Sequence, residues 1–234
     1  TWPSSLAQHQ SKALELWALD HHDALQRERL TQWQLDRQWQ LIRTLAADLG
    51  ILLFGDLPFY VSADSADVWS HRNLFTISAD GTLSTQSGVP PDYFSETGQL
   101  WGSPVYRWWR HRLTRFQWWR QRIARQRQLM DLLRLDHFRA LAKFWAVPGG
   151  DTTAQHGSWQ PSPGASLLRK LRRDAGGSLP LIAEDLGVIT PDVESLRDGF
   201  ALPGMKVLQF AFDGLTDNPY LPENIDGARW VVYT

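Results

Sequence analysis

Cysteine is absent from this chain of 234 residues, which excludes disulfide bonds, thiolate catalysis and cysteine-ligated metals. Long hydrophobic runs are also absent. The longest runs, such as residues 51–54, fall far short of the roughly 20 apolar residues that cross a bilayer. An excess of one charge is missing too, because 24 Lys and Arg stand against 25 Asp and Glu. The sequence therefore gives no electrostatic indication of a nucleic-acid or anionic-membrane partner.

Two kinds of ligand-binding motif are missing as well. Neither GxGxxG nor GxxxxGK[ST] occurs, so no phosphate-binding loop is indicated. The seven His show no HxxxH or HExxH spacing. The acids Asp64, Asp67, Asp92 and Asp213 are scattered, which favours surface or capping roles over a metal site. We expect neither a metal nor an organic cofactor.

The residues that are present describe a globular chain. Hydrophobic residues make up 43% of it, enough for one large core. Thirteen Trp is a high count, and aromatic faces commonly bind sugar rings, although several of these Trp fall in helical patterns and are expected to pack. The chain starts Thr1-Trp2-Pro3 without Met and stops inside an expected strand at residues 230–234. We therefore expect a fragment of a longer protein.

Acids stand at the ends of apolar strands in three places. Residues 132–135 lead into Asp136, residues 181–183 lead into Glu184, and Asp56 interrupts a third apolar run. Because the carboxyl ends of parallel strands lie at one edge, these acids are expected to meet in one pocket. For either of the first two acids alone, a surface ion pair or a turn cap is an equally good explanation. The repetition of the pattern favours catalysis.

The order of elements predicts a parallel α/β fold. Strand and helix alternate from residue 51 onward, and an incomplete (β/α)8 barrel fits the length better than a doubly wound sheet. The expected strands are 51–61, 132–135, 181–183, 205–212 and 230–234. The expected helices are 6–19, 23–49, a capped start at 64–69, 106–130, 167–175 and one that begins at Thr190-Pro191.

Three segments allow more than one interpretation. Residues 78–104 and 147–166 are rich in Gly, Pro, Ser and Thr and are predicted to be loops, the first an ordered loop over a binding site. The segment 106–130 carries eight Arg and no acid among its aromatic residues. It could bind nucleic acid, but a solvated helix face whose Arg stems cover aromatic rings is favoured.

Five ordered sequence blocks carry a specific resemblance. They read FGDLPFYVSADSADVW, GVPPDYFSETGQLWGSPVY, LRLDHFRAL, IAEDLGVITPDV and LPGMKVLQFAF. In this order and spacing they resemble the 4-α-glucanotransferases of the amylomaltase or disproportionating-enzyme type, glycoside hydrolase family 77 of the α-amylase clan. The resemblance covers about residues 25–234.

The resemblance implies a (β/α)8 barrel and a retaining mechanism on α-1,4-glucans. Asp136 matches the nucleophile, Glu184 matches the general acid/base, and Arg134 matches the arginine that orients the nucleophile. Other matched positions contact sugar or cover the cleft, and they are His137, Asp185, Asp56, Tyr93, Gln99 and Trp101. The implied partners are an α-1,4-glucan donor and a glucose or maltooligosaccharide acceptor.

One departure from the family pattern concerns the end of the chain. The family follows the VVYT strand with Gly-Thr-His-Asp-Asn, whose Asp is the third catalytic carboxylate, and this chain stops at Thr234. We therefore expect residues 1–234 to be a single catalytic-domain fragment with little activity alone, from a cytoplasmic or plastid enzyme. An α-glucan hydrolase and a non-catalytic glucan-binding module remain the alternatives.

Overall fold

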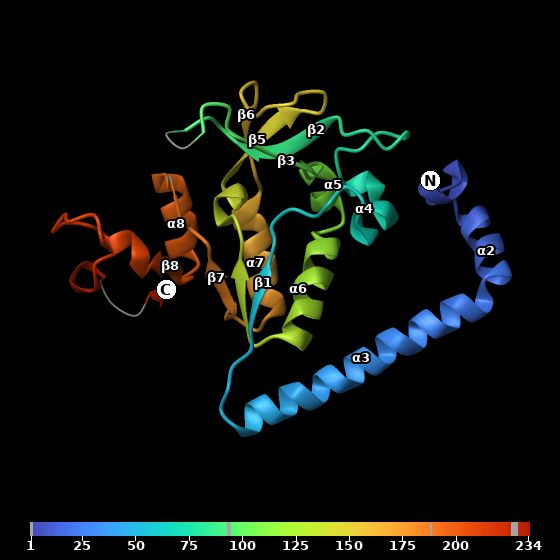
Figure 1. Cartoon of the computed structure of the whole chain (residues 1–234), viewed down its shortest axis with the longest axis horizontal. Coiled ribbons are helices and arrows are strands. Elements are labelled where there is room, and N and C mark those ends of the chain that lie inside the picture. The colour runs from blue at the N-terminus through green and yellow to red at the C-terminus, as the bar shows by residue number, and fades with distance from the viewer. Residues whose placement is uncertain (1, 93–94, 188, 226–228) are drawn as a thin grey trace. The chain divides into compact units, whose positions relative to one another are not determined.

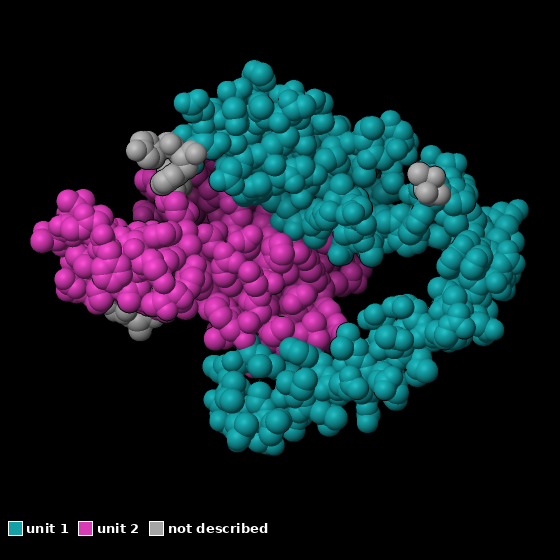
Figure 2. Space-filling model, viewed as in Figure 1, with its two compact units in different colours: residues 1–53, 60–110, 146–158 teal, residues 54–59, 111–145, 159–234 magenta. Residues whose placement is uncertain are grey.

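The computed structural model describes residues 2–92, 95–187, 189–225 and 229–234. The chain divides into two compact units (Figure 2). Unit 1 comprises residues 1–53, 60–110 and 146–158, and unit 2 comprises residues 54–59, 111–145 and 159–234. Both units are discontinuous in sequence, because the chain leaves unit 2 after residue 59 and again after residue 145.

Unit 2 is built on parallel strands. Strands β1 (Phe54–Leu57), β4 (Leu132–Leu135) and β7 (Leu181–Ala183) form a three-stranded parallel sheet in the order β1-β4-β7 (Figure 1). Strands β8 (Gly204–Val207) and β9 (Trp230–Tyr233) form a second parallel pair. The backbone N–H of Ala183 donates to the carbonyl of Pro203 at 2.8 Å, so β7 lies next to β8. The parallel α/β prediction is confirmed.

Helices precede the later strands of unit 2. α6 (Gln117–Leu129) leads to β4, α7 (Gly164–Asp174) leads to β7, and α8 (Pro191–Gly199) leads to β8. In Figure 1, α6 and α7 lie alongside the sheet. Each helix buries one apolar stripe, as its 3.6-residue spacing predicts. The large buried apolar residues are Trp118, Trp119 and Ile123 on α6, Leu167, Leu168 and Leu171 on α7, and Val193 on α8, where Arg197 is buried as well.

Unit 1 contains most of the helical N-terminal part. Its helices are α1 (Ser4–Ala7), α2 (Ser11–Asp20), α3 (His22–Asp48) and α4 (Ala66–Ser70), and α5 (Trp108–Leu113) begins in unit 1 and ends in unit 2. The predicted long helix is confirmed as α3, and Gly50 ends it with a left-handed φ of 69°. The capped start is confirmed at α4, where Ser65 Oγ accepts the Val68 N–H at 3.2 Å. The predicted helix over 6–19 is instead α1 and α2, separated at His9 with φ 56°.

The two predicted loops contain strands, so that part of the prediction is wrong. β2 (Thr85–Val89) pairs antiparallel with β3 (Gln99–Pro104). The sheet order is β3-β2-β5-β6, with β5 at Lys143–Pro148 and β6 at Ser158–Pro161. The apolar alternation that marks a strand is hidden because polar residues are buried: Gln86 is 6% exposed and its amide donates to the Asp151 carbonyl at 2.9 Å.

Two further predictions need correction. The helix over 106–130 is interrupted between α5 and α6, where Arg115 and Phe116 have left-handed φ values of 51° and 58°. Neither residue is Gly or Pro, so no sequence signal marks the break. The strand predicted over 205–212 ends at Val207, and the chain continues as the 3-10 turn η3 (Leu208–Ala211). The other 3-10 turns are η1 (Arg72–Leu74), η2 (Phe138–Leu141) and η4 (Pro222–Asn224).

Within the described ranges, every helix is too short or too polar to cross a bilayer.

Candidate active site

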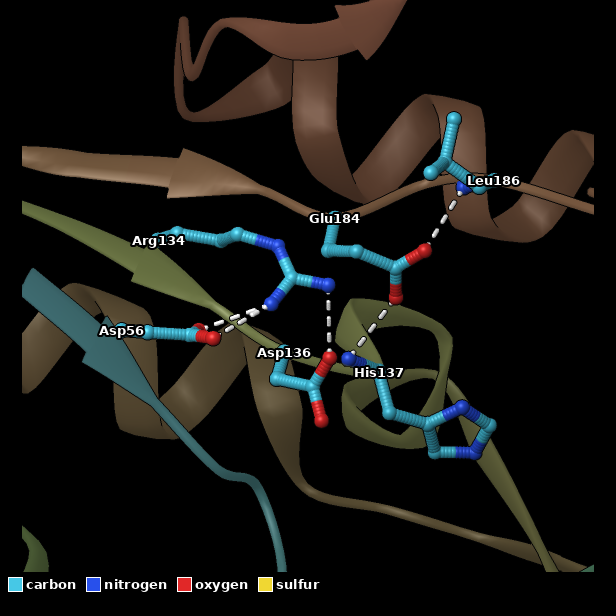
Figure 3. Close-up of polar contacts among 6 residues, drawn as sticks. All are labelled: Asp56, Arg134, Asp136, His137, Glu184 and Leu186. Carbon is cyan, nitrogen blue, oxygen red and sulfur yellow. Dashed lines mark hydrogen bonds and ion pairs between the residues drawn. The ribbon is translucent and has the colours of Figure 1, made fainter. Parts of the chain in front are cut away.

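Three neighbouring strands of unit 2 bring the predicted acids together. In the register of the sheet, Asp56 on β1 lies opposite Arg134 on β4, and Arg134 lies opposite Ile182 on β7. Side chains of a strand alternate between faces, so Asp136 and Glu184, two residues further along, share the face of Arg134. Figure 3 shows their carboxyl groups on the same side of the sheet. The structure therefore places these strand-end acids close together on one face, as the sequence predicts.

Arg134 connects two of the acids. One terminal nitrogen donates to both oxygens of Asp56, at 2.8 and 2.7 Å, and the other donates to Oδ1 of Asp136 at 2.8 Å (Figure 3). Burial lowers the pKa of Arg134, but the Asp136 and Asp56 carboxylates outweigh it and the pKa is raised. The side chain of Asp136 is 43% exposed, and Oδ2 has no hydrogen-bond partner among the described residues. One oxygen of Asp136 is held and the other faces open space.

Glu184 sits in a different environment from Asp136. Its Oε2 accepts the backbone N–H of His137 at 2.8 Å, and its Oε1 accepts that of Leu186 at 3.1 Å. Burial raises the pKa of Glu184, the N–H groups of Leu186 and His137 lower it, and the Asp136 carboxylate raises it. The net shift is upward, so Glu184 holds a proton more readily than a free glutamic acid.

His137 turns the chain out of β4. It has φ 52° and ψ 49°, the left-handed conformation, and precedes η2. This turn aims the His137 N–H at Glu184. Burial, with a smaller effect of Arg139, lowers the pKa of the His137 ring to about 4. The imidazole is therefore neutral at neutral pH and offers hydrogen bonds rather than charge.

Asp185 follows Glu184 but points elsewhere. Its side chain is 2% exposed, its Oδ2 contacts Nη1 of Arg197 on α8, and its Oδ1 accepts the Met205 N–H on β8 at 2.8 Å. A sugar contact by Asp185 stays a prediction. The sequence analysis did not single out Arg197. Arg197 lies four residues after Val193 and therefore on the same face of α8, which is buried. This spacing between an apolar residue and an Arg is visible in the sequence.

The residues predicted to cover the cleft belong to unit 1. Gln99 and Trp101 lie on β3, and Trp101 Nε1 donates to Gln99 Oε1 at 3.3 Å. The Trp101 ring is 40% exposed and meets the Tyr60 ring edge-on, with centroids 6.0 Å apart. Tyr93 lies outside the described residues. The placement of Gln99 and Trp101 over the carboxylates stays a prediction.

The chemistry of the site is that of paired carboxyl groups. Among the described residues, no three His, Asp or Glu side chains gather in a way that could hold a metal ion. An oriented carboxylate with one open oxygen is suited to attack carbon, and a buried carboxyl with a raised pKa is suited to deliver a proton. This combination fits displacement at an acetal carbon.

Comparison with known proteins gives one consistent result. A family described as 4-alpha-glucanotransferase, glycoside hydrolase family 77, matches residues 1–234. The 4-alpha-glucanotransferase of Synechocystis is 46% identical over 100% of this chain and 46% of its own length. That of Thermus thermophilus is 45% identical over 100% of this chain and 47% of its length. The chloroplastic/amyloplastic 4-alpha-glucanotransferase of Oryza sativa is 47% identical over 100% of this chain and 39% of its own length.

A solved structure agrees with these relatives. The amylomaltase from Streptococcus agalactiae in complex with acarbose is 36% identical and superposes with a TM-score of 0.93, over 99% of this chain and 47% of that one. The chain thus spans about half the length of the relatives it matches. With the strand-end carboxyl pair in place and a family match along its whole length, the chain belongs to glycoside hydrolase family 77, the 4-α-glucanotransferases.

Proposed function

We propose that this chain supplies the nucleophile and the general acid/base of a 4-α-glucanotransferase that transfers α-1,4-glucan segments between maltooligosaccharides with retention. One observation carries the proposal. Asp136 and Glu184 leave the carboxyl ends of adjacent parallel strands on one face, in contrasting environments. Retaining enzymes need such a pair, with the two carboxyl groups about 5 to 5.5 Å apart.

In the first step, the open oxygen of Asp136 attacks the anomeric carbon of the donor. The bond from that carbon to the glycosidic oxygen breaks, and the protonated Glu184 gives its proton to the leaving oxygen. Arg134 orients Asp136 through the 2.8 Å contact with Oδ1. The products are a glucan linked through its anomeric carbon to Asp136 and a shortened glucan with a free 4-hydroxyl.

In the second step, the 4-hydroxyl of an acceptor sugar attacks the same anomeric carbon. Glu184, now a carboxylate, takes the hydroxyl proton, and Asp136 leaves as a carboxylate. Two inversions give overall retention. Transfer exceeds hydrolysis when acceptor sugars displace water from the site. We assign that role to Gln99 and Trp101, whose exposed positions on β3 suit a sugar contact.

We further propose that the strands of unit 2 are consecutive strands of a (β/α)8 barrel and that both units belong to one catalytic domain. The support is that β1, β4, β7, β8 and β9 follow one another in space in chain order, while the intervening strands β2, β3, β5 and β6 form a separate sheet, and that a helix stands before β4, β7 and β8. Active sites of such barrels lie at the carboxyl ends of the strands, which is where the acids stand.

The test uses an exchange protein, in which residues 1–234 replace the matching segment of the Thermus thermophilus relative, because that relative is 45% identical and about twice as long. The exchange protein is incubated with maltotriose after its cooperative unfolding is verified. Glucose together with products longer than maltotriose is the expected result. The 234-residue chain alone and the exchange protein with Glu184→Gln are the controls.

The same assay separates the alternatives. Glucose and maltose without longer products would indicate a hydrolase that shares the two carboxyl groups. A folded exchange protein that binds maltotriose and leaves it unchanged would indicate a non-catalytic glucan-binding module. Either outcome would contradict the transfer proposal.

A further inference from the structure

The acid/base Glu184 is followed by a buried charge that the proposed reaction does not use. Asp185 and Arg197 have side chains 2% and 11% exposed, and they form an ion pair between the end of β7 and α8. Burying two charges removes both from water, and such a pair commonly adds little stability compared with apolar residues of similar size. We therefore ask what the Asp185–Arg197 pair contributes besides stability.

The Asp185 carboxylate ties three elements together. Its Oδ2 contacts Arg197, while Oδ1 accepts the Met205 N–H of β8 at 2.8 Å. The Arg197 guanidinium also donates to Asp198 at 2.9 Å and lies over the Trp230 ring of β9, 4.6 Å from its centroid. The segment after β7 is thus fixed to α8, β8 and β9.

The packing around this carboxylate is tight. A Cβ on Gly204 would lie 2.5 Å from Asp185 Oδ2 and would also collide with the Trp230 ring. Only glycine fits between these two groups, since a real Cβ does not approach so closely. The position of Asp185 is therefore set by Arg197, by the Met205 N–H and by the close approach of Gly204.

Glu184 and Asp185 are adjacent residues whose side chains contact different elements. Glu184 faces Asp136, and Asp185 faces the α8 and β8 side. The Leu186 N–H that holds Glu184 Oε1 comes from the residue after Asp185. A shift of the Asp185 backbone would therefore move both the Glu184 carboxyl and one of the two N–H groups that hold it.

We propose that Asp185 and Arg197 form a positioning pair, which holds the Glu184 carboxyl in register with Asp136 without touching the sugar. The proposal rests on the proposed function, because it assigns Glu184 the proton transfers. A positioning role and a sugar-binding role for Asp185 predict different kinetic effects. A positioning pair acts on kcat and on the titration of Glu184, whereas a sugar contact acts on KM.

The test removes both charges together. Asp185→Asn keeps an oxygen for the Met205 N–H, and Arg197→Met keeps an unbranched stem of comparable reach. The double variant leaves no unpaired buried charge, so it is expected to fold. In the exchange protein we expect kcat on maltotriose to fall by about tenfold or more, since small displacements of reacting groups are costly, with KM within about twofold.

A second readout uses the 234-residue chain itself and needs no activity. The Glu184 carboxyl carbon, labelled with ¹³C and assigned with Glu184→Gln, is titrated by NMR. We expect its midpoint to move to higher pH in the double variant because the Leu186 N–H bond is loosened. The charged or titratable groups that face Glu184 are Asp136 and Arg134 from β4, with Asp56 behind them, His137 from the turn, and Tyr220.

Two further variants complete the design. Arg197→Lys keeps a cation for Asp185 and is expected to restore part of kcat relative to Arg197→Met. The matched control is the Arg120–Asp174 pair between α6 and α7, with side chains 36% and 32% exposed, changed to Met and Asn. It removes the same two charges away from the site and is expected to leave kcat and the Glu184 midpoint unchanged.

Two results would overturn the proposal. A folded double variant with unchanged kcat and an unchanged Glu184 midpoint would reduce the pair to a structural role. A rise in KM at constant kcat would make Asp185 a sugar-binding residue. Failure of the unchanged exchange protein to form products longer than maltotriose would count against the proposed function instead, and the NMR titration would still decide whether the pair positions Glu184.

Discussion

Asp136 and His137 are adjacent residues whose environments assign them different tasks. Asp136 extends the face of β4 that carries Arg134, and its carboxylate has one oxygen engaged and one open. His137 adopts a left-handed backbone and presents its N–H to Glu184. A single turn after a buried strand thus delivers both the proposed nucleophile and a hydrogen-bond donor for the proposed acid/base.

The first prediction concerns the nucleophile. Asp136→Asn removes the attacking oxygen while Asp56 still occupies Arg134, so the sheet is expected to stay folded. Transfer by the exchange protein should fall by at least about 10³-fold, with maltotriose binding changed only a few-fold. Kinetics and calorimetric titration with maltotriose measure the two effects. Asp131→Asn, at the opposite end of β4, is the matched control, and near-normal turnover of Asp136→Asn would remove it as nucleophile.

The second prediction concerns pH and the His137 ring. The folded-state pKa is lowered to about 4, below the ordinary value of 6.5, so unfolding takes up a proton between these values. The contribution of the neutral His137 ring to the free energy of unfolding is fully present above pH 6.5. It falls by on the order of 1–3 kcal/mol as the pH falls toward 4. His137→Asn tolerates the left-handed backbone and should flatten this part of the pH dependence. Denaturant unfolding at pH 7, 5.5 and 4 measures it, and equal slopes in both proteins would exclude this role of His137.

At the scale of elements, three helices end in the same way. After α3, α7 and α8 the last turn closes with paired backbone bonds, for example Ala201 N–H to the Asp198 carbonyl at 2.9 Å and Leu202 N–H to that of Arg197 at 3.1 Å after α8. The residue with left-handed φ is Gly50 after α3 and Gly176 after α7, but Ala201, with φ 52°, after α8. α8 therefore carries a strained residue at a position where glycine is preferred.

The third prediction follows from this comparison. Ala201→Gly relieves the left-handed strain and should raise the free energy of unfolding by about 0.5–1 kcal/mol, because the strain is larger than the added chain entropy of Gly. Gly50→Ala makes the opposite change in the same motif, with no atom within 4 Å of the new Cβ, and should lower stability by about 1 kcal/mol. Urea unfolding of both variants checks the signs, and a destabilising Ala201→Gly would contradict the interpretation.

At the scale of the whole molecule, α3 carries an exposed apolar face. Leu30, Trp33, Leu41 and Leu45 lie on one side of the helix, each at least 59% exposed, and Ala46 is the buried residue recorded on α3. Four large exposed apolar side chains on one helix face leave more apolar surface uncovered than singly scattered residues do, although Arg37 lies over the Trp33 ring. The 234-residue chain is therefore expected to self-associate in solution.

The fourth prediction tests this face. Leu41→Glu with Leu45→Glu places two charges on it while keeping good helix formers, and should reduce both self-association and binding of a hydrophobic dye. Sedimentation at several concentrations and dye fluorescence provide the measurements. Ser11→Glu with Lys12→Gln makes the same change in net charge on the exposed first turn of α2. Equal association of the two double variants would show that net charge, not the apolar face, is responsible.

The sequence alone determined the features that depend on neighbours along the chain. The spacing of apolar residues predicted α3, the hydroxyl of Ser65 predicted α4, and the strand ends located Asp56, Asp136 and Glu184. Five sequence blocks indicated the family. These features are local because helix periodicity, capping and strand length are decided within a few residues.

The tertiary structure decided the features that depend on contacts between distant residues. The strand β2 escaped prediction because buried Gln86 obtains its partner from residue 151, 65 positions away. The break before α6 follows from left-handed residues that are neither Gly nor Pro. The pairing of Asp185 with Arg197, and the backbone N–H of His137 on Glu184, join elements whose register no local pattern encodes. Residue identity therefore gave the chemistry available to the site, and packing between elements decided which atoms meet.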